Sequence, residues 1–207
     1  MMQDRGRVCI IDDDEAVRDS LHILLFSSGY QTCSFESADA WLEAAAPPDV
    51  DVYLLDLRMP GTDGMELHRR MLEQGCKVPV IFITGHGDIP LAVTAMQRGA
   101  ADFLTKPFEE GELLEKIDAA TSSFRARKSE MDEKQAIQER LNGLTPREQD
   151  VLGLIVQGYS NKQAAAKLNI SPRTVEIHRA RVMEKTGADS VATLVRMATQ
   201  LDGPEEQ

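Results

Sequence analysis

The sequence has no segment suited to a membrane. Its apolar runs are all shorter than the roughly 18 residues that a helix needs to cross a bilayer. Residues 1–7 also lack the apolar core of a secretory signal. We therefore expect a cytoplasmic protein with no membrane partner.

Disulfide and transition-metal patterns are missing as well. The 3 cysteines are odd in number and form no CxxC motif, and the 4 histidines include no pair at the spacing of helical metal ligands. An odd number of unpaired cysteines is typical of buried thiols in a reducing compartment. We expect free thiols and no transition-metal site.

Positive charge is scarce overall but unevenly distributed. The 207 residues carry a net charge of -11, and the first 120 hold 10 Lys and Arg against 22 Asp and Glu. Residues 144–201 hold 8 basic against 5 acidic residues. The acidity therefore belongs to the first part, and the mildly basic second part permits contacts with phosphate groups.

Five short apolar segments alternate with segments of helical spacing in the first part. The expected strands are 7–11, 31–35, 50–56, 78–84 and 101–105, and the expected helices are 16–28, 37–46, 64–74, 89–98 and 109–123. Repeated strand–helix units predict a parallel five-stranded sheet with helices on both faces, an α/β fold of the flavodoxin-like (βα)5 kind.

Polar side chains stand where these strands end. Asp12 and Asp13 follow the first strand, Asp56 ends the third, Thr84 the fourth, and Lys106 follows the fifth. Because the carboxyl ends of parallel strands meet at one edge, we expect these groups to form one site. Clustered carboxylates repel one another unless a cation joins them, and hard oxygen ligands suit Mg²⁺. Such a site favours phosphoryl transfer to an acid, because the developing charge is neutralised on every side.

Two other interpretations of this acid cluster fit less well. In an inert flavodoxin-like domain with solvated acids, the Thr84 and Lys106-Pro107 positions would be coincidences. A haloacid-dehalogenase-like phosphatase also uses a nucleophilic Asp at a strand end, but it needs a second Asp two residues later. That position is Arg58, which argues against such an enzyme.

Four motifs in order make residues 7–121 resemble the receiver domain of two-component response regulators. They are Ile11-Asp12-Asp13-Asp14, the run from Asp56 to Gly64, Ile83-Thr84-Gly85-His86, and the run from Gly99 to Phe108. The resemblance implies that Asp56 accepts a phosphoryl group from a phosphohistidine of a sensor histidine kinase. It implies that Mg²⁺ is bound by Asp12, Asp13, Asp56 and the backbone carbonyl of Arg58. Thr84 and Lys106 would contact the phosphoryl group, and Asp14 would face outward.

The resemblance also implies a switch formed by Thr84 and Phe103. If Thr84 moves toward the phosphoryl group, the aromatic ring can turn into the space it leaves. The alternative is that Phe103 belongs only to the hydrophobic core. Arg58 and His86 would flank the phosphoryl group and tune its loss. The receiver would promote only its own phosphorylation and dephosphorylation, so we expect no other enzyme activity.

Residues 122–143 predict a helical linker, since they are rich in charge and contain no Pro or Gly before Gly143. The helix could continue the one expected at 109–123. Ile117, Phe124 and Met131 are seven residues apart and could form a seam with a partner helix. A solvated charged helix explains the same segment equally well.

Residues 144–201 predict a small all-α domain of four helices. Thr145 to Glu148 and Ser160 to Gln163 have the spacing of capping boxes, and Ser171-Pro172 predicts the start of a third helix. Short helix, tight turn and longer helix form a helix-turn-helix arrangement at about 161–180.

One face of the third helix suits DNA. Val175, His178 and Val182 share the opposite face, which we expect to pack inside the domain. Mixed charged and small apolar groups suit base edges and thymine methyls, while flanking cations suit phosphates. Glu176 could instead pair with a neighbouring arginine. The residues expected to contact DNA are Lys162, Arg173, Thr174, Glu176, Ile177, Arg179, Ala180 and Arg181.

The motifs in residues 144–198 resemble the LuxR-type DNA-binding domain, so the whole chain is similar to FixJ/NarL-family response regulators, and particularly to FixJ-type members. Leu144-Thr145-Pro146-Arg147-Glu148, Ser160-Asn161-Lys162 and Thr174-Val175 carry this resemblance. It implies a transcription regulator that dimerises on phosphorylation, binds double-stranded promoter DNA and contacts RNA polymerase. The candidate dimer surface holds Ile89, Leu91, Val93 and Met96. Two alternatives remain: signalling mainly through protein contacts, and activity without phosphorylation.

Overall fold

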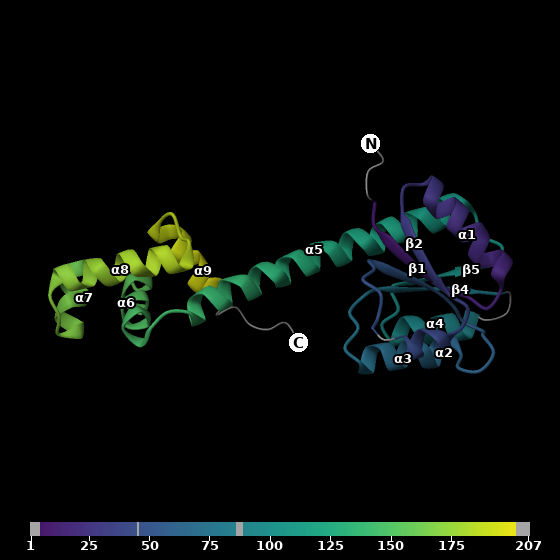
Figure 1. The fold of residues 1–207 in the computed structure, drawn as a ribbon, viewed down its shortest axis with the longest axis horizontal. Helices are drawn as coiled ribbons and strands as arrows, with labels where there is room; N and C mark the ends of the chain where they lie inside the picture. Colours follow the sequence, from purple (N-terminus) through teal and green to yellow (C-terminus); the bar gives the residue numbers. More distant parts are fainter. Residues whose placement is uncertain (1–4, 45, 86–88, 202–207) are drawn as a thin grey trace. The chain divides into compact units, whose positions relative to one another are not determined.

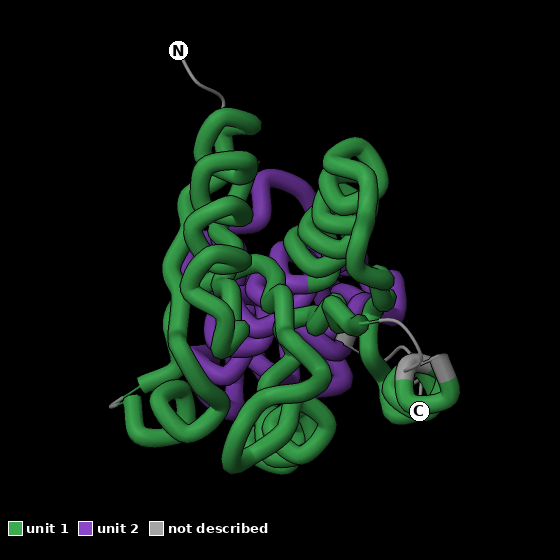
Figure 2. Tube along the Cα trace, turned by 90° about the vertical axis from the view of Figure 1, so that its right-hand side faces the viewer, with its two compact units in different colours: residues 1–127 green, residues 128–207 purple. Residues whose placement is uncertain are grey.

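The chain forms two compact units, residues 1–127 and 128–207 (Figure 2). Each unit buries hydrophobic side chains of its own. The structure is a computed structural model, and it describes residues 5–44, 46–85 and 89–201. None of the helices in these ranges is both long and apolar enough to cross a bilayer.

The first unit is built on a parallel sheet of five strands in the order β2-β1-β3-β4-β5. The strands are β1 (Arg7–Ile11), β2 (Gln31–Phe35), β3 (Val52–Asp56), β4 (Val80–Thr84) and β5 (Asp102–Thr105). This is the doubly wound order in which the strand sequence reverses between β1 and β3. The predicted flavodoxin-like fold is confirmed.

Helices cover both faces of this sheet, with α1 and α5 on one side and α2, α3 and α4 on the other (Figure 1). They are α1 (Glu15–Ser27), α2 (Ala38–Glu43), α3 (Gly64–Glu73), α4 (Ile89–Gln97) and α5 (Glu110–Asn142). Successive strand side chains point to opposite faces, so Leu54 joins the core under α1 and α5 while Tyr53 and Leu55 join the other core. Burial on both faces explains why β3 and β4 are apolar along nearly their whole length.

The helix α5 is much longer than the expected segment 109–123, and it includes the predicted linker. Phe124 and Ile137 are buried, whereas every residue from 125 to 135 is exposed. Arg125 holds the first unit's end of this stretch through bonds of 3.0 and 2.9 Å to the Asp51 carboxylate. Within one chain the stretch is therefore a solvated charged helix, and Met131 is half-exposed. A seam with a second chain stays a prediction.

The second unit contains α6 (Pro146–Val156), α7 (Asn161–Leu168), α8 (Pro172–Thr186) and α9 (Val191–Leu201). Both predicted capping boxes are present, at Thr145 and at Ser160, so each helix begins where the sequence indicated. Asn169 adopts the left-handed conformation that allows the tight turn between α7 and α8.

An ion pair between a buried glutamate and an exposed lysine joins the start of α6 to the end of α8. Glu148 is 2% exposed, and its carboxylate accepts a 2.7 Å hydrogen bond from Lys185 Nζ and a 2.8 Å bond from the Thr145 backbone N–H. These contacts, led by Lys185, lower the pKa of Glu148 to about 2. The same carboxylate therefore closes the capping box and binds the last turn of α8.

We expect Glu148→Gln to lower the melting temperature of the second unit at about pH 7, and to do so less at about pH 3. The carboxyl pKa is depressed from its usual value of 4.5 to about 2 in the folded chain. Its contribution is therefore present above pH 4.5 and is lost as the pH falls toward 2. Differential scanning calorimetry of the full-length protein at both pH values measures the difference.

The exposed Glu184 on α8 supplies the control. Glu184→Gln should leave the transition of the second unit nearly unchanged at both pH values. A Glu148→Gln effect of equal size at the two pH values would contradict the role of the ionised carboxylate.

Candidate functional site

The ends of β1, β3 and β5 meet at a cluster of buried charges. Asp12 follows β1 and is 2% exposed, and Asp56 ends β3 and is 7% exposed. Lys106 Nζ donates hydrogen bonds of 2.7 Å to Asp12 Oδ2 and 3.0 Å to Asp56 Oδ1. One ammonium thus bridges two carboxylates that come from neighbouring strands. The structure brings together these three residues, as expected from the strand ends.

Burial and charge oppose each other in this cluster. Burial raises the pKa of Asp56 above its ordinary range, and the Lys106 ammonium offsets only part of that increase. Burial alone would lower the pKa of Lys106, but the hydrogen bonds and charges of Asp12 and Asp56 outweigh it, so its pKa is raised. Lys106 is therefore held as a cation between the Asp12 and Asp56 carboxyl groups.

Backbone groups hold Asp56 in place. The Arg58 N–H donates a 2.9 Å hydrogen bond to Asp56 Oδ2. The Lys106 N–H donates a 2.7 Å bond to the Thr84 carbonyl, which holds the backbone of the residue that contacts Asp56. Gly64 begins α3 directly against β3, where a Cβ would lie 2.1 Å from the Asp56 carbonyl oxygen. Any side chain at Gly64 would push this helix or Asp56 out of position. The sequence marked Asp63-Gly64 only as a turn, and the close approach could not be seen in it.

The remaining acids of the β1–α1 loop differ in environment. Asp14 is exposed and caps α1, accepting a 2.9 Å bond from the Ala16 N–H, which agrees with its expected outward position. Asp13, the third expected Mg²⁺ ligand, is exposed too. Arg18, which sequence reasoning missed, donates a 2.7 Å hydrogen bond to the Asp12 carbonyl and so supports this loop from α1.

The donor chemistry fits a hard divalent cation in part. Asp12 and Asp56 are buried carboxyl groups bonded to the same ammonium, and their oxygens are hard ligands of the kind that suits such a cation. Among the described residues, however, no three His, Cys, Asp or Glu side chains are already grouped as a metal site. Asp13 would have to turn toward the other two to complete the predicted ligand set.

Thr84 and Phe103 lie on the same face of the sheet. In the β4–β5 register Phe82 is opposite Phe103, and Thr84 is opposite Thr105, two residues further along. Thr84 is fully buried, and its hydroxyl donates a 3.3 Å bond to the Gly85 carbonyl. Phe103 is half-buried and packs against the core under α2, α3 and α4. The register permits the predicted switch and does not test it.

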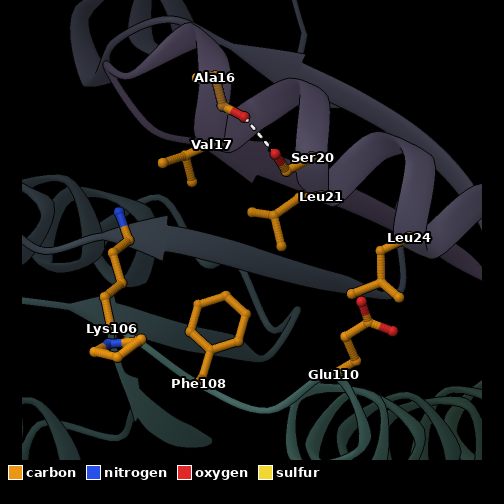
Figure 3. A pocket seen from close by; sticks show the side chains of 9 residues that line it. Ala16, Val17, Ser20, Leu21, Leu24, Lys106, Phe108 and Glu110 are labelled. Atoms are coloured by element: carbon orange, nitrogen blue, oxygen red, sulfur yellow. Dashed lines mark hydrogen bonds between the residues drawn. The ribbon is translucent and has the colours of Figure 1, made fainter.

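An apolar groove of about 450 Å³ adjoins the charged cluster (Figure 3). Lys106 and Glu110 lie at its two ends, and Phe108 lies between them opposite α1. Ser20 is satisfied inside α1 by a 2.7 Å bond to the Ala16 carbonyl, so it presents little unsatisfied polarity to the groove. The lining residues are Ala16, Val17, Ser20, Leu21, Leu24, Lys106, Pro107, Phe108 and Glu110.

The helix α8 presents the expected face to solvent. Val175 and Val182 are buried in the core of the second unit, and His178 is half-buried with its Nδ1 unpartnered. Thr174 is half-buried and its hydroxyl is bonded to Ser171, while Arg179 donates a 3.2 Å bond to Asn161 Oδ1 and ties α8 to α7. Six of the predicted DNA-contacting residues are exposed: Lys162, Arg173, Glu176, Ile177, Ala180 and Arg181.

The predicted dimer surface is exposed on α4 as far as the structure describes it. Leu91, Val93 and Met96 are 39%, 48% and 40% exposed, which is unusual for three apolar side chains on one short helix. His86 and the side chain of Ile89 lie outside the described residues.

Two family profiles match the chain. Residues 8–118 match the response regulator receiver domain, and residues 142–198 match the bacterial regulatory proteins of the luxR family. The transcriptional regulatory protein FixJ of Bradyrhizobium diazoefficiens is 44% identical over 197 residues, covering 95% of this chain and 96% of the relative. FixJ of Rhizobium meliloti is 46% identical, covering 92% and 94%.

Solved structures of similar proteins agree with these matches. The response regulator StyR has a TM-score of 0.87 and 39% identity, over 94% of this chain and 98% of its own. Full-length FixJ from B. japonicum has a TM-score of 0.61 and 42% identity, over 98% and 100%.

We expect Lys106→Met to lower the unfolding free energy of the first unit by about 2 kcal/mol, because it leaves two buried carboxylates without their shared cation. The loss is smaller than for a fully buried pair, since the Lys106 side chain is 28% exposed. Trp41 is the only tryptophan and is buried in this unit, so urea unfolding followed by tryptophan fluorescence reports on this unit alone.

Lys116→Met is the matched control. Its partner Asp102 is 36% exposed, so the pair contributes less than about 1 kcal/mol. Equal losses for the two variants would refute the view that Lys106 compensates buried charge.

Proposed function

The chain belongs to the response regulators that join a receiver domain to a LuxR-type DNA-binding domain, and on this premise we propose that phosphoryl transfer to Asp56 controls its binding to DNA. The observation that carries the proposal is the buried Asp56 carboxylate held by the Lys106 ammonium at the carboxyl edge of the sheet. The exposed face of α8 supplies the output, since it presents charged and apolar groups on a helix-turn-helix scaffold.

The chemistry follows from the partners of Asp56. A carboxylate oxygen of Asp56 attacks the phosphorus of a phosphohistidine on a sensor kinase, the new O–P bond forms, and the N–P bond breaks with its electron pair passing to the imidazole. Lys106 and the Thr84 hydroxyl hold oxygens of the transferred group and offset its charge. Asp12, Asp13, Asp56 and the Arg58 carbonyl would hold Mg²⁺, which supplies further neutralisation of the phosphoryl oxygens when bound.

The groove between α1 and the β5–α5 loop offers a donor protein an apolar surface that shares Lys106 with the acceptor site. A kinase domain that packs there would bring its phosphohistidine near Asp56. The sensor kinase is thus proposed as the partner at this edge of the receiver.

Phosphorylation is proposed to act through Thr84 and the exposed apolar side chains of α4. When the Thr84 hydroxyl turns to a phosphoryl oxygen, Phe103 on the same face of the sheet can move inward. The altered surface of α4 and β5 would then favour a homodimer through Leu91, Val93 and Met96. Each chain carries one recognition helix, so a dimer fits two half-sites about one DNA turn apart.

The proposed boundaries are 7–121 for the receiver, 122–143 for the linker and 144–201 for the DNA-binding domain, with the helix-turn-helix at about 161–180. RNA polymerase is the proposed partner at the promoter. Two alternatives are a regulator that acts without phosphorylation and one that signals mainly through protein contacts. The following experiments distinguish both from the proposed function.

We expect the full-length chain with Mg²⁺ to sediment as a monomer, and to become a dimer when beryllofluoride, a mimic of the acyl phosphate, is added. Asp56→Asn should remain a monomer in both conditions, because it lacks the carboxylate that binds the mimic. Analytical ultracentrifugation of the four samples measures the change. The same state in all four samples would refute dimerisation driven by phosphorylation.

We expect Arg181→Ala and Lys162→Ala to weaken DNA binding, because both side chains are exposed on the helix-turn-helix. Loss of a phosphate contact at Lys162 should lower the slope of log affinity against log salt by about 1, and loss of a base contact at Arg181 should cost about 1–3 kcal/mol. The probe is a duplex that the wild-type chain selects from random-sequence DNA, with binding followed by fluorescence anisotropy.

Arg147→Ala is the control, because it removes one exposed positive charge from α6, outside the helix-turn-helix. Its affinity should be close to that of the wild type. If all three variants bind DNA alike, the assigned DNA-binding face is wrong. The hypothesis that the protein signals mainly through protein contacts then gains support.

A further inference from the structure

Two of the three cysteines are direct neighbours in the sheet. Cys9 on β1 is opposite Cys33 on β2, and both side chains belong to the core under α2, α3 and α4. Neighbouring strands lie about 4.8 Å apart, which is inside the Cα–Cα range of about 4.4–6.8 Å that a disulfide requires. A bond between the sulfurs therefore needs no large movement of the backbone.

A cavity adjoins one of these cysteines, Cys33, which is half-buried. It has a volume of about 260 Å³, and Cys33 lines it together with Arg7 and Asp49. The Arg7 and Asp49 side chains are 51% and 77% exposed, so the cavity reaches the surface. A water molecule occupies about 30 Å³ in the liquid, so a small oxidant can enter. Cys9 is completely buried and does not line this cavity.

The electrostatic environment divides the roles of the two thiols. The hydrogen bond from Cys9 lowers the pKa of Cys33 against the effect of burial, and the Arg7 guanidinium lowers it further. The same hydrogen bond, together with burial, raises the pKa of Cys9. Cys33 is thus the better nucleophile, and Cys9 remains a thiol beside it.

Cys76 lacks this combination. It follows α3, and burial raises the pKa of its thiol. It lines neither of the two cavities described above. Cys76 therefore serves as an internal reference for reactivity.

We propose that Cys33 and Cys9 form an oxidation-sensitive dithiol site that closes to a disulfide when hydrogen peroxide enters the cavity beside β2. The Cys33 thiolate sulfur attacks one peroxide oxygen, the S–O bond forms, and the O–O bond breaks to release hydroxide. The Cys9 sulfur then attacks the sulfenic sulfur, its proton passes to the departing hydroxyl, and water leaves. In sum, two thiols lose two electrons and one peroxide becomes two waters.

This site is independent of Asp56 and of the proposed phosphorylation. Cys9 and Cys33 belong neither to the charged cluster nor to α8. Their oxidation is measured without a kinase or DNA.

The test is thiol mapping of the folded full-length protein after brief treatment with hydrogen peroxide. Remaining thiols are alkylated, the protein is digested without reductant, and the peptides are identified by mass spectrometry. We expect a linked pair of peptides containing Cys9 and Cys33, lighter than the two reduced peptides by two hydrogens. Cys76 should be alkylated, and dithiothreitol should restore all three thiols.

Two variants check the order of the steps. Cys9→Ala should leave a sulfenic acid at Cys33 that dimedone captures, and Cys76→Ala should form the same disulfide as the wild type. In the absence of oxidant, iodoacetamide should label Cys33 about tenfold faster than Cys76.

The mapping of the wild type decides the matter even if a variant does not fold. A Cys33 that stays reduced, a disulfide between two chains, or faster oxidation of Cys76 would each overturn the proposal.

Discussion

The bridge from Lys106 to Asp12 and Asp56 is the interaction on which the receiver site depends. Two buried carboxylates on neighbouring strands would repel each other, and the Lys106 ammonium, which is hydrogen-bonded to both, offsets that repulsion at the sheet edge. The bridge also fixes the loop after β5, whose residues form one end of the apolar groove. The ammonium offsets only part of the effect of burial, so the pKa of Asp56 stays raised. The fold therefore holds a buried carboxyl group beside an ammonium at the carboxyl edge of the sheet.

The sequence was sufficient to predict this edge of the sheet because each strand and the polar residue at its end can be recognised from a few neighbouring residues. Each strand is a short apolar run, each ends at a recognisable polar residue, and parallel connections force those ends together. The capping boxes of α6 and α7 were predictable for the same reason, since two residues three positions apart specify each of them. Features that depend on residues a few positions apart along the chain are visible in sequence patterns.

Features that depend on tertiary contacts were not visible. The close approach of Gly64 to Asp56, the support of the Asp12 loop by Arg18, and the Glu148–Lys185 pair join residues whose proximity follows only from packing. The exposure of Asp13 likewise depends on the path of a loop. The three cysteines looked unrelated because their spacing carries no motif, whereas the register of β1 and β2 places two of them side by side.

The middle of the long helix α5 is exposed to solvent. Between the buried Phe124 and Ile137, residues 125–135 have no apolar core to hold them, so helical propensity and pairs along the helix must contribute. One such pair joins Lys134 to Glu130 at 3.0 Å, and pairs of this kind each contribute only a few tenths of a kcal/mol, about 0.2–0.5. A helix stabilised in this way opens more readily than one packed on a core. The middle of α5 therefore opens more readily than helices such as α1, whose Leu21 and Leu25 are buried in a core.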